Sequence, residues 1–164
     1  MTLQLSNKYI KLIIPFFLGI ITSFSLPPYN YLFINFITFP ALLFFFIKNY
    51  ENSKWISFNI GWVFGFGYFI SNLYWITNSL TFDVNFKLII PFALILIPLF
   101  LGIFYGLVTF LSSLFNLKNK LSSVLIFSIF FGGIEFLRSF ILGGFPWNLL
   151  VFSVSSNLPS LQIL

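Results

Sequence analysis

Long runs of apolar residues, separated by short polar or turn-forming segments, dominate the sequence. The runs cover about residues 12–26, 32–47, 55–80, 88–115 and 122–142, and a further apolar stretch starts near 158–164. A helix needs roughly 20 mainly apolar residues to cross the hydrocarbon core of a bilayer, and several runs approach or exceed that length. The pattern therefore predicts an all-α membrane protein, a polytopic transmembrane helix bundle with five complete spans and the start of a sixth.

The composition agrees with a membrane environment. Hydrophobic residues make up 59% of the chain and charged residues only 7%, against roughly 25% charged residues in an average soluble domain. The net charge of +5 does not indicate nucleic acid, because the basic residues stand singly at the ends of apolar runs. The chain has no cysteine and no histidine, so we expect no metal site, no cofactor and no thiol or imidazole catalysis.

The amino-terminal run has two interpretations. Lys8 and Lys11 precede its apolar residues, and a small-x-small triplet follows at 23–25, as in a cleavable signal peptide. Further apolar spans follow at once, however, and this favours a retained first helix.

The placement of lysine predicts the orientation of the bundle. If each run crosses the membrane, the loops on one side carry Lys8, Lys11, Lys48, Lys54, Lys118 and Lys120. Only Lys87 lies in a loop on the other side. Because basic residues accumulate in cytoplasmic loops, we expect a multi-pass protein whose amino terminus is cytoplasmic.

Two opposite charges, Glu135 and Arg138, lie inside the fifth apolar run. Their spacing of three residues places them on one helix face, within reach of an ion pair. Charges inside a membrane are costly and often functional. The pair either neutralises itself and fixes helix packing, or contacts a polar substrate or lipid headgroup. In the second case Arg138, about one and a half turns before Gly143, could extend toward the outer interface and meet a phosphate.

Aromatic and amide residues near the predicted outer face are further candidates for a lipid or substrate region. Phe145, Pro146 and Trp147 follow the fifth run, either as part of an interfacial aromatic belt or as a lining for an acyl chain. Asn72 and Trp75 share one helix face at the end of the third run. They either bond a neighbouring helix or line the polar entry to a cavity.

Two pairs of glycines predict close helix packing. Gly61 and Gly65 lie four residues apart in the third run, and Gly102 and Gly106 repeat that spacing in the fourth. Small residues at this spacing let the backbones of membrane helices approach closely.

Three stretches together resemble a known family. The letters EFLR at 135–138, followed by GFPW at 144–147, resemble the signature of bacterial apolipoprotein N-acyltransferase. The stretch SLPPY at 25–29 is similar to the same family, as is GWVFGFG at 61–67 leading to NLYW at 72–75. The resemblance covers almost the whole chain, and the first motif is the most specific.

The resemblance implies an enzyme of the bacterial inner membrane with eight helices and an extracytoplasmic nitrilase-like domain. Such an enzyme moves a fatty acyl group from a phospholipid, the acyl donor, to the amino group of a diacylglyceryl-cysteine at the start of a lipoprotein, the acceptor. The catalytic Glu, Lys and Cys of the family belong to the nitrilase-like domain. We expect that domain to be absent from residues 1–164, so no catalytic residue is assigned and the chain alone is expected to be inactive.

Two other functions remain as alternatives. A small membrane transporter or a structural membrane subunit would also be a helical bundle rich in phenylalanine. The apolar runs contain one charged pair and no histidine, and these are few ionisable groups for an ion relay. Interactions with membrane lipids are expected under every interpretation.

Overall fold

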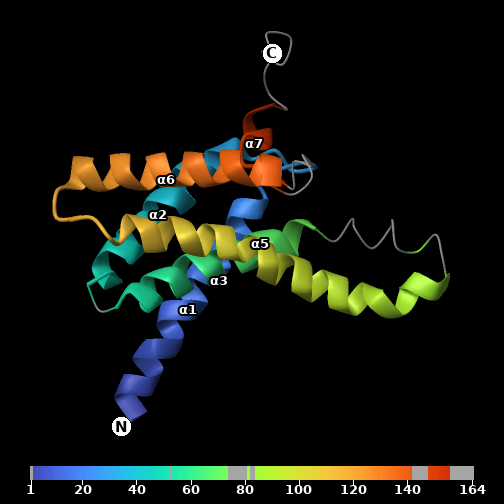
Figure 1. The fold of residues 1–164 in the computed structure, drawn as a ribbon, viewed down its shortest axis with the longest axis horizontal. Coiled ribbons are helices and arrows are strands. Elements are labelled where there is room, and N and C mark those ends of the chain that lie inside the picture. The colour runs from blue at the N-terminus through green and yellow to red at the C-terminus, as the bar shows by residue number, and fades with distance from the viewer. Residues whose placement is uncertain (1, 52, 74–80, 82–83, 142–147, 156–164) are drawn as a thin grey trace.

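The computed structural model describes residues 2–51, 53–73, 81, 84–141 and 148–155 (Figure 1). These residues form helices and short helical turns, and no strand is present among them. The elements are α1 (Thr2–Ser23), η1 (Leu32–Ile34), α2 (Asn35–Asn49), α3 (Lys54–Asn72), η2 (Val84–Ile89), α5 (Ile90–Ser112), α6 (Lys120–Ile141) and α7 (Phe152–Ser155). The predicted all-α class is confirmed.

Three of the described helical stretches are long and apolar enough to cross a membrane. They are Leu32–Asn49, Lys87–Ser112 and Lys120–Ile141, and Lys11–Ser23 is a shorter apolar helix. These stretches support a membrane protein, but they do not establish five complete spans. Helix α3 is not among the three, because it carries glycines, amides and hydroxyls where the others carry aliphatic residues.

The observed helix limits differ from the predicted limits mainly for the first and third apolar runs. Helix α1 begins at Thr2 rather than near residue 12, since no glycine or proline interrupts its polar first turns. The third predicted run extends to residue 80, whereas α3 ends at Asn72 with Leu73 as its C-cap. The start of a sixth span, predicted near residues 158–164, lies outside the described residues.

Helix α3 lies at the centre of the bundle and packs closely against α5. A Cβ atom added to Gly61 would lie 2.2 Å from the carbonyl oxygen of Tyr105, and one added to Gly65 would lie 2.9 Å from the Cα of Gly102. Only glycine permits backbones this close. The close approach predicted from the spacing of the glycines is therefore confirmed.

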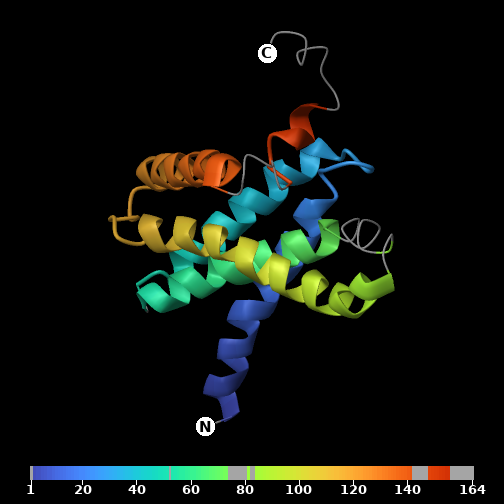
Figure 2. The same cartoon turned by 45° about the vertical axis from the view of Figure 1, so that its right-hand side comes forward.

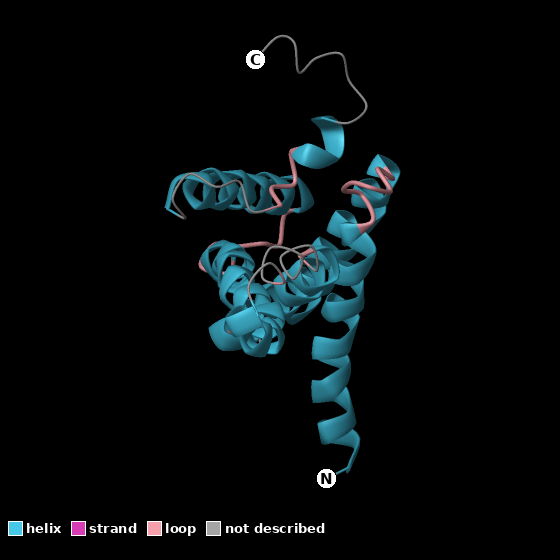
Figure 3. Cartoon of the chain, turned by 90° about the vertical axis from the view of Figure 1, so that its right-hand side faces the viewer, coloured by secondary structure: helices cyan, strands magenta, loops and turns pink. Residues whose placement is uncertain are grey.

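The opposite side of α3 packs against α1 in the same way. A Cβ atom added to Gly19 would lie 2.0 Å from the carbonyl oxygen of Phe64, and one added to Gly67 would lie 2.3 Å from that of Phe16. Figure 3 shows α1 crossing the other helices and extending beyond them at its amino-terminal end. Because α3 is enclosed by protein, it can be less apolar than a helix that faces lipid.

Lysines in and beside two connecting segments share one end of the bundle. The α2–α3 turn and the α5–α6 connection lie together at this end, on the left in Figure 1. Lys54, at the start of α3, donates a hydrogen bond to the carbonyl oxygen of Ser113, at the end of α5. Lys48, Lys118 and Lys120 border one common hollow. Helix α6 packs on α5 and leads from this end toward α7 (Figure 2).

Candidate functional site

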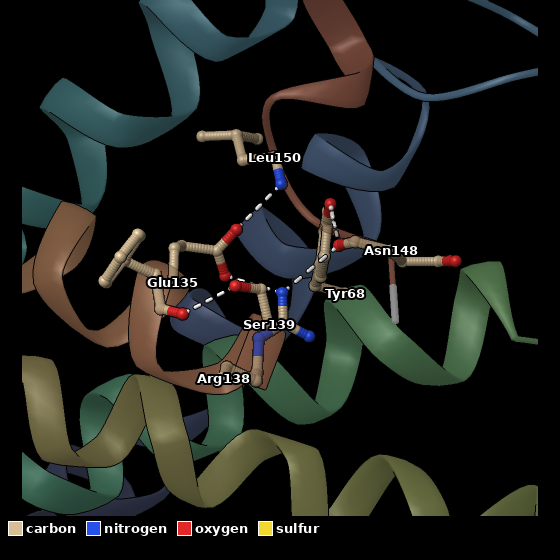
Figure 4. Close-up of polar contacts among 7 residues, drawn as sticks. Tyr68, Glu135, Arg138, Ser139, Asn148 and Leu150 are labelled. Atoms are coloured by element: carbon tan, nitrogen blue, oxygen red, sulfur yellow. Dashed lines mark hydrogen bonds and ion pairs between the residues drawn. The ribbon is translucent and has the colours of Figure 1, made fainter. Parts of the chain in front are cut away.

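A buried ion pair on α6 forms the centre of the candidate site. A terminal guanidinium nitrogen of Arg138 lies 2.6 Å from Oε1 of Glu135, as the spacing of three residues predicts (Figure 4). The Arg138 side chain is 0% exposed and that of Glu135 is 13% exposed. Both charges therefore face the protein rather than the surrounding medium.

Aromatic rings from two other helices enclose the guanidinium. The Cζ atom of Arg138 lies 4.9 Å from the ring centroid of Phe69 on α3 and 5.9 Å from that of Tyr105 on α5. A cation over an aromatic face gains roughly 0.5–2 kcal/mol, and more of this when water is excluded. The rings thus offset part of the cost of burying Arg138.

The ion pair also holds the turn at residues 148–150. The backbone N–H of Leu150 donates to Oε2 of Glu135 at 2.8 Å. The carbonyl oxygen of Asn148 accepts from Arg138 at 3.4 Å and from the Tyr68 hydroxyl at 3.1 Å (Figure 4). Asn148 has a φ of 44°, a conformation that asparagine tolerates better than most residues. Helices α3 and α6 together fix the chain that follows residue 147.

Asn72 connects three segments at the same end of the bundle. Its side-chain amide donates to the carbonyl oxygen of Ser23 at 3.4 Å, and its own carbonyl oxygen accepts from the Asn148 side chain at 3.4 Å. It also borders a small hollow of about 260 Å³. The hollow is lined by Leu26, Pro27, Asn72, Asn148 and Phe152. Asn72 therefore bonds neighbouring segments and at the same time borders a small, mainly apolar hollow.

Glu135 borders a larger, open hollow between α2 and α6. This hollow has a volume of about 510 Å³, and its polar lining residues other than Glu135 are Asn35, Ser139 and Ser153. The Asn35 amide donates to the Ser153 hydroxyl at 2.9 Å, so α2 and α7 are joined beside it. The rest of the lining is apolar apart from Gly132. The ion pair thus lies at the margin of a groove suited to hydrocarbon.

The structure brings together three of the seven residues that the sequence selects. Glu135, Arg138 and Asn72 meet around the turn at 148–150. Trp75, Phe145, Pro146 and Trp147 lie outside the described residues. Sequence reasoning missed Tyr68, Phe69, Tyr105 and Asn148. A hydroxyl inside an apolar run was the available signal for Tyr68, because a buried hydroxyl needs a partner.

The arrangement is suited to holding a conformation rather than to chemical reaction. Both oxygens of Glu135 already accept hydrogen bonds, one from Arg138 and one from Leu150. The described residues contain no group of three or more side chains of the kinds that bind a metal ion. In the described residues, the site is a buried ion pair whose hydrogen bonds hold the turn at 148–150 in place.

Fold and site together define a helical bundle of the membrane type, with one end fixed by a buried ion pair. A sequence profile of the family described as "Apolipoprotein N-acyltransferase N-terminal domain" matches residues 18–164. The chain therefore belongs to the apolipoprotein N-acyltransferase family, as the resemblance of its motifs predicts.

Individual relatives carry the same name. An apolipoprotein N-acyltransferase of Rhizobium rhizogenes is 33% identical over 138 residues, which cover 79% of this chain and 26% of the relative. One from Brucella melitensis is 31% identical over 154 residues, covering 89% of this chain and 29% of the relative. The chain thus spans between a quarter and a third of the length of these relatives.

Proposed function

We propose that residues 1–164 form the membrane-embedded part of an apolipoprotein N-acyltransferase of the bacterial inner membrane, with the amino terminus in the cytoplasm. The enzyme would transfer a fatty acyl group from a phospholipid to the N-terminal diacylglyceryl-cysteine of a lipoprotein. The observation that carries this proposal is the match of the family's N-terminal domain to residues 18–164. The 164 residues alone would be inactive, because the resemblance assigns the catalytic Glu, Lys and Cys to a nitrilase-like domain.

In this proposal the Glu135–Arg138 pair acts as a positioning device for the lipid and substrate region. Residues 142–147, with the Phe-Pro-Trp motif, connect α6 to the turn at 148–150. Glu135 and Arg138 bind that turn from α6 through Leu150 and Asn148. The residues that flank this segment are therefore held, Ile141 as the last residue of α6 and Asn148 by the buried ion pair. Phe145, Pro146 and Trp147 lie between these two supports in the sequence, and we propose them as part of the lipid and substrate region.

The experiment uses a full-length relative that carries the same EFLR and GFPW motifs, with substitutions at the position that matches Arg138. Transfer of a labelled acyl chain from phospholipid to a diacylglyceryl peptide is measured in detergent micelles, together with the thermal unfolding temperature. We expect Arg138→Ala to lower acyl transfer at least about tenfold, and Arg138→Lys to restore part of it, since lysine keeps the charge but not the planar fork. Normal acyl transfer by both folded variants would exclude Arg138 from the mechanism.

The same assay separates the alternatives. A transporter or a structural subunit would yield no acylated peptide even as a full-length, folded protein. Within the described residues, aromatic rings lie over the Arg138 guanidinium, which is unlike the hydrated path that an ion relay requires.

A further inference from the structure

A long apolar groove runs between α2 and α6, and the proposed acyl transfer does not account for its lysine-bearing end. Three hollows succeed one another along these helices, with volumes of about 510, 380 and 560 Å³. The first two share Phe131, Gly132 and Leu150, and the second and third share Pro40, Leu43 and Val124. The shared linings make the three hollows one continuous groove.

Phe39, Phe127 and Phe131 form the floor of this groove, and Phe46 packs beneath them. The rings of Phe39 and Phe131 lie 5.0 Å apart, and those of Phe46 and Phe127 lie 6.5 Å apart. Helix α6 packs mainly on α5, and α2 packs mainly on α1 and the short turn before it. The two helices therefore meet at the aromatic floor and stay apart above it.

The end of the groove away from Glu135 is basic. Lys48, Lys118 and Lys120 border the hollow there, and no carboxylate among the described residues does. All three lysines are exposed. Their charge is thus available to an anionic group placed at the mouth of an otherwise apolar groove. Basic pockets between membrane helices are known binding sites for acidic phospholipid headgroups.

The part of the groove that lies between the lysines and Gly132 matches one leaflet of a membrane in length. From Lys120 to Gly132, α6 rises about 18 Å at 1.5 Å per residue. One leaflet of a hydrocarbon core of about 30 Å measures about 15 Å. A phospholipid with its phosphate at the lysines would therefore extend its acyl chain along the phenylalanine floor to about Gly132.

We propose that this groove holds a resident anionic phospholipid, with its phosphate bound by Lys48, Lys118 and Lys120 and an acyl chain lying between α2 and α6. The lipid does not react. It fills the space between two helices that do not close on each other, and it is separate from the acyl donor. The proposal stands on the lining of the groove alone, so it can fail while the proposed acyl transfer holds.

Glycines on α6 provide a matched pair of variants. Gly132 borders the first and second hollows, whereas its neighbour Gly133 borders none of the three. A Cβ atom added at either position would meet no atom within 4 Å. Gly132→Leu therefore starts a side chain in open space at the border of the groove. Gly133→Leu makes the same chemical change outside it, and both substitutions favour the helix.

The test is native mass spectrometry of the full chain in detergent, with phosphatidylglycerol or phosphatidylcholine added in turn. We expect tighter binding of phosphatidylglycerol to the unaltered protein. The triple variant Lys48→Gln, Lys118→Gln, Lys120→Gln should bind it at least about tenfold more weakly, since each lysine contributes up to about fivefold. Lys87→Gln, whose lysine lies outside the groove, should not differ from the unaltered protein. Gly132→Leu should lose bound lipid, and Gly133→Leu should retain it.

Several results would overturn the proposal. Equal binding of the two lipids, unchanged binding by the triple variant, or equal lipid retention by the two leucine variants would each exclude a lipid in this groove. A dimer that forms without lipid and disappears only in Gly132→Leu would assign the groove to a second copy of the chain. Circular dichroism of each variant confirms that the helices are intact.

Discussion

Replacement of Glu135 by glutamine would leave the Arg138 guanidinium buried without a counter-charge. Arg138 is 0% exposed and its guanidinium lies against the rings of Phe69 and Tyr105, so water cannot replace the lost carboxylate without opening the bundle. Removal of one partner from a buried ion pair typically costs about 3–5 kcal/mol. The glutamine oxygen can still accept the hydrogen bond from Leu150 or from Arg138. We therefore expect Glu135→Gln to lower the free energy of unfolding by about 2–3 kcal/mol.

The measurement is unfolding of the full chain in mixed micelles by increasing amounts of sodium dodecyl sulfate, followed by circular dichroism. Glu51→Gln is the matched control, because Glu51 is exposed on the α2–α3 turn and its loss should change stability by less than about 0.5 kcal/mol. The double variant Glu135→Leu, Arg138→Met should be less destabilised than the sum of the two single changes, since no unpaired charge remains buried.

Two results would refute this reasoning. If Glu135→Gln were no more destabilising than Glu51→Gln, the ion pair would not stabilise the bundle. If the Leu and Met substitutions were additive in the double variant, the 2.6 Å contact between Glu135 and Arg138 would carry no coupling energy.

Two further variants test the packing of α3 on α5 and the hydrogen bonds that hold the turn at 148–150, by the same unfolding measurement. Gly61→Ala should lower the free energy of unfolding by about 1–3 kcal/mol, because its Cβ would lie 2.2 Å from a backbone oxygen of α5. In Gly133→Ala the added Cβ lies in open space, so the free energy of unfolding should stay unchanged or rise by up to about 1 kcal/mol. Equal changes in Gly61→Ala and Gly133→Ala would contradict the close packing of α3 on α5. Tyr68→Phe removes the hydroxyl that donates to Asn148 and should cost about 1 kcal/mol. The exposed change Tyr31→Phe should cost nothing measurable, and an equal loss in both would exclude a role for the Tyr68 hydrogen bond.

Local features of the candidate site were predictable, but its surroundings were not. The ion pair of Glu135 and Arg138 follows from a spacing of three residues on one helix, a contact that the helix itself creates. Its other partners, Phe69 and Tyr105, come from helices whose placement depends on how the whole bundle packs. The burial of Arg138 also lies outside local reasoning, because one helix alone would let its side chain reach an interface.

The sequence by itself determined the helical class and the glycine spacings that allow close helix packing, but not which helices they join. Apolar runs in a membrane must satisfy their backbone hydrogen bonds internally, and glycines four residues apart leave room for a neighbouring backbone. Only the tertiary structure decided that α3 is enclosed, that Glu135 and Arg138 hold the turn at 148–150, and that α2 and α6 leave a groove between them. Each of these depends on which helices meet and at what separation, and contacts between distant segments set that geometry rather than any local pattern.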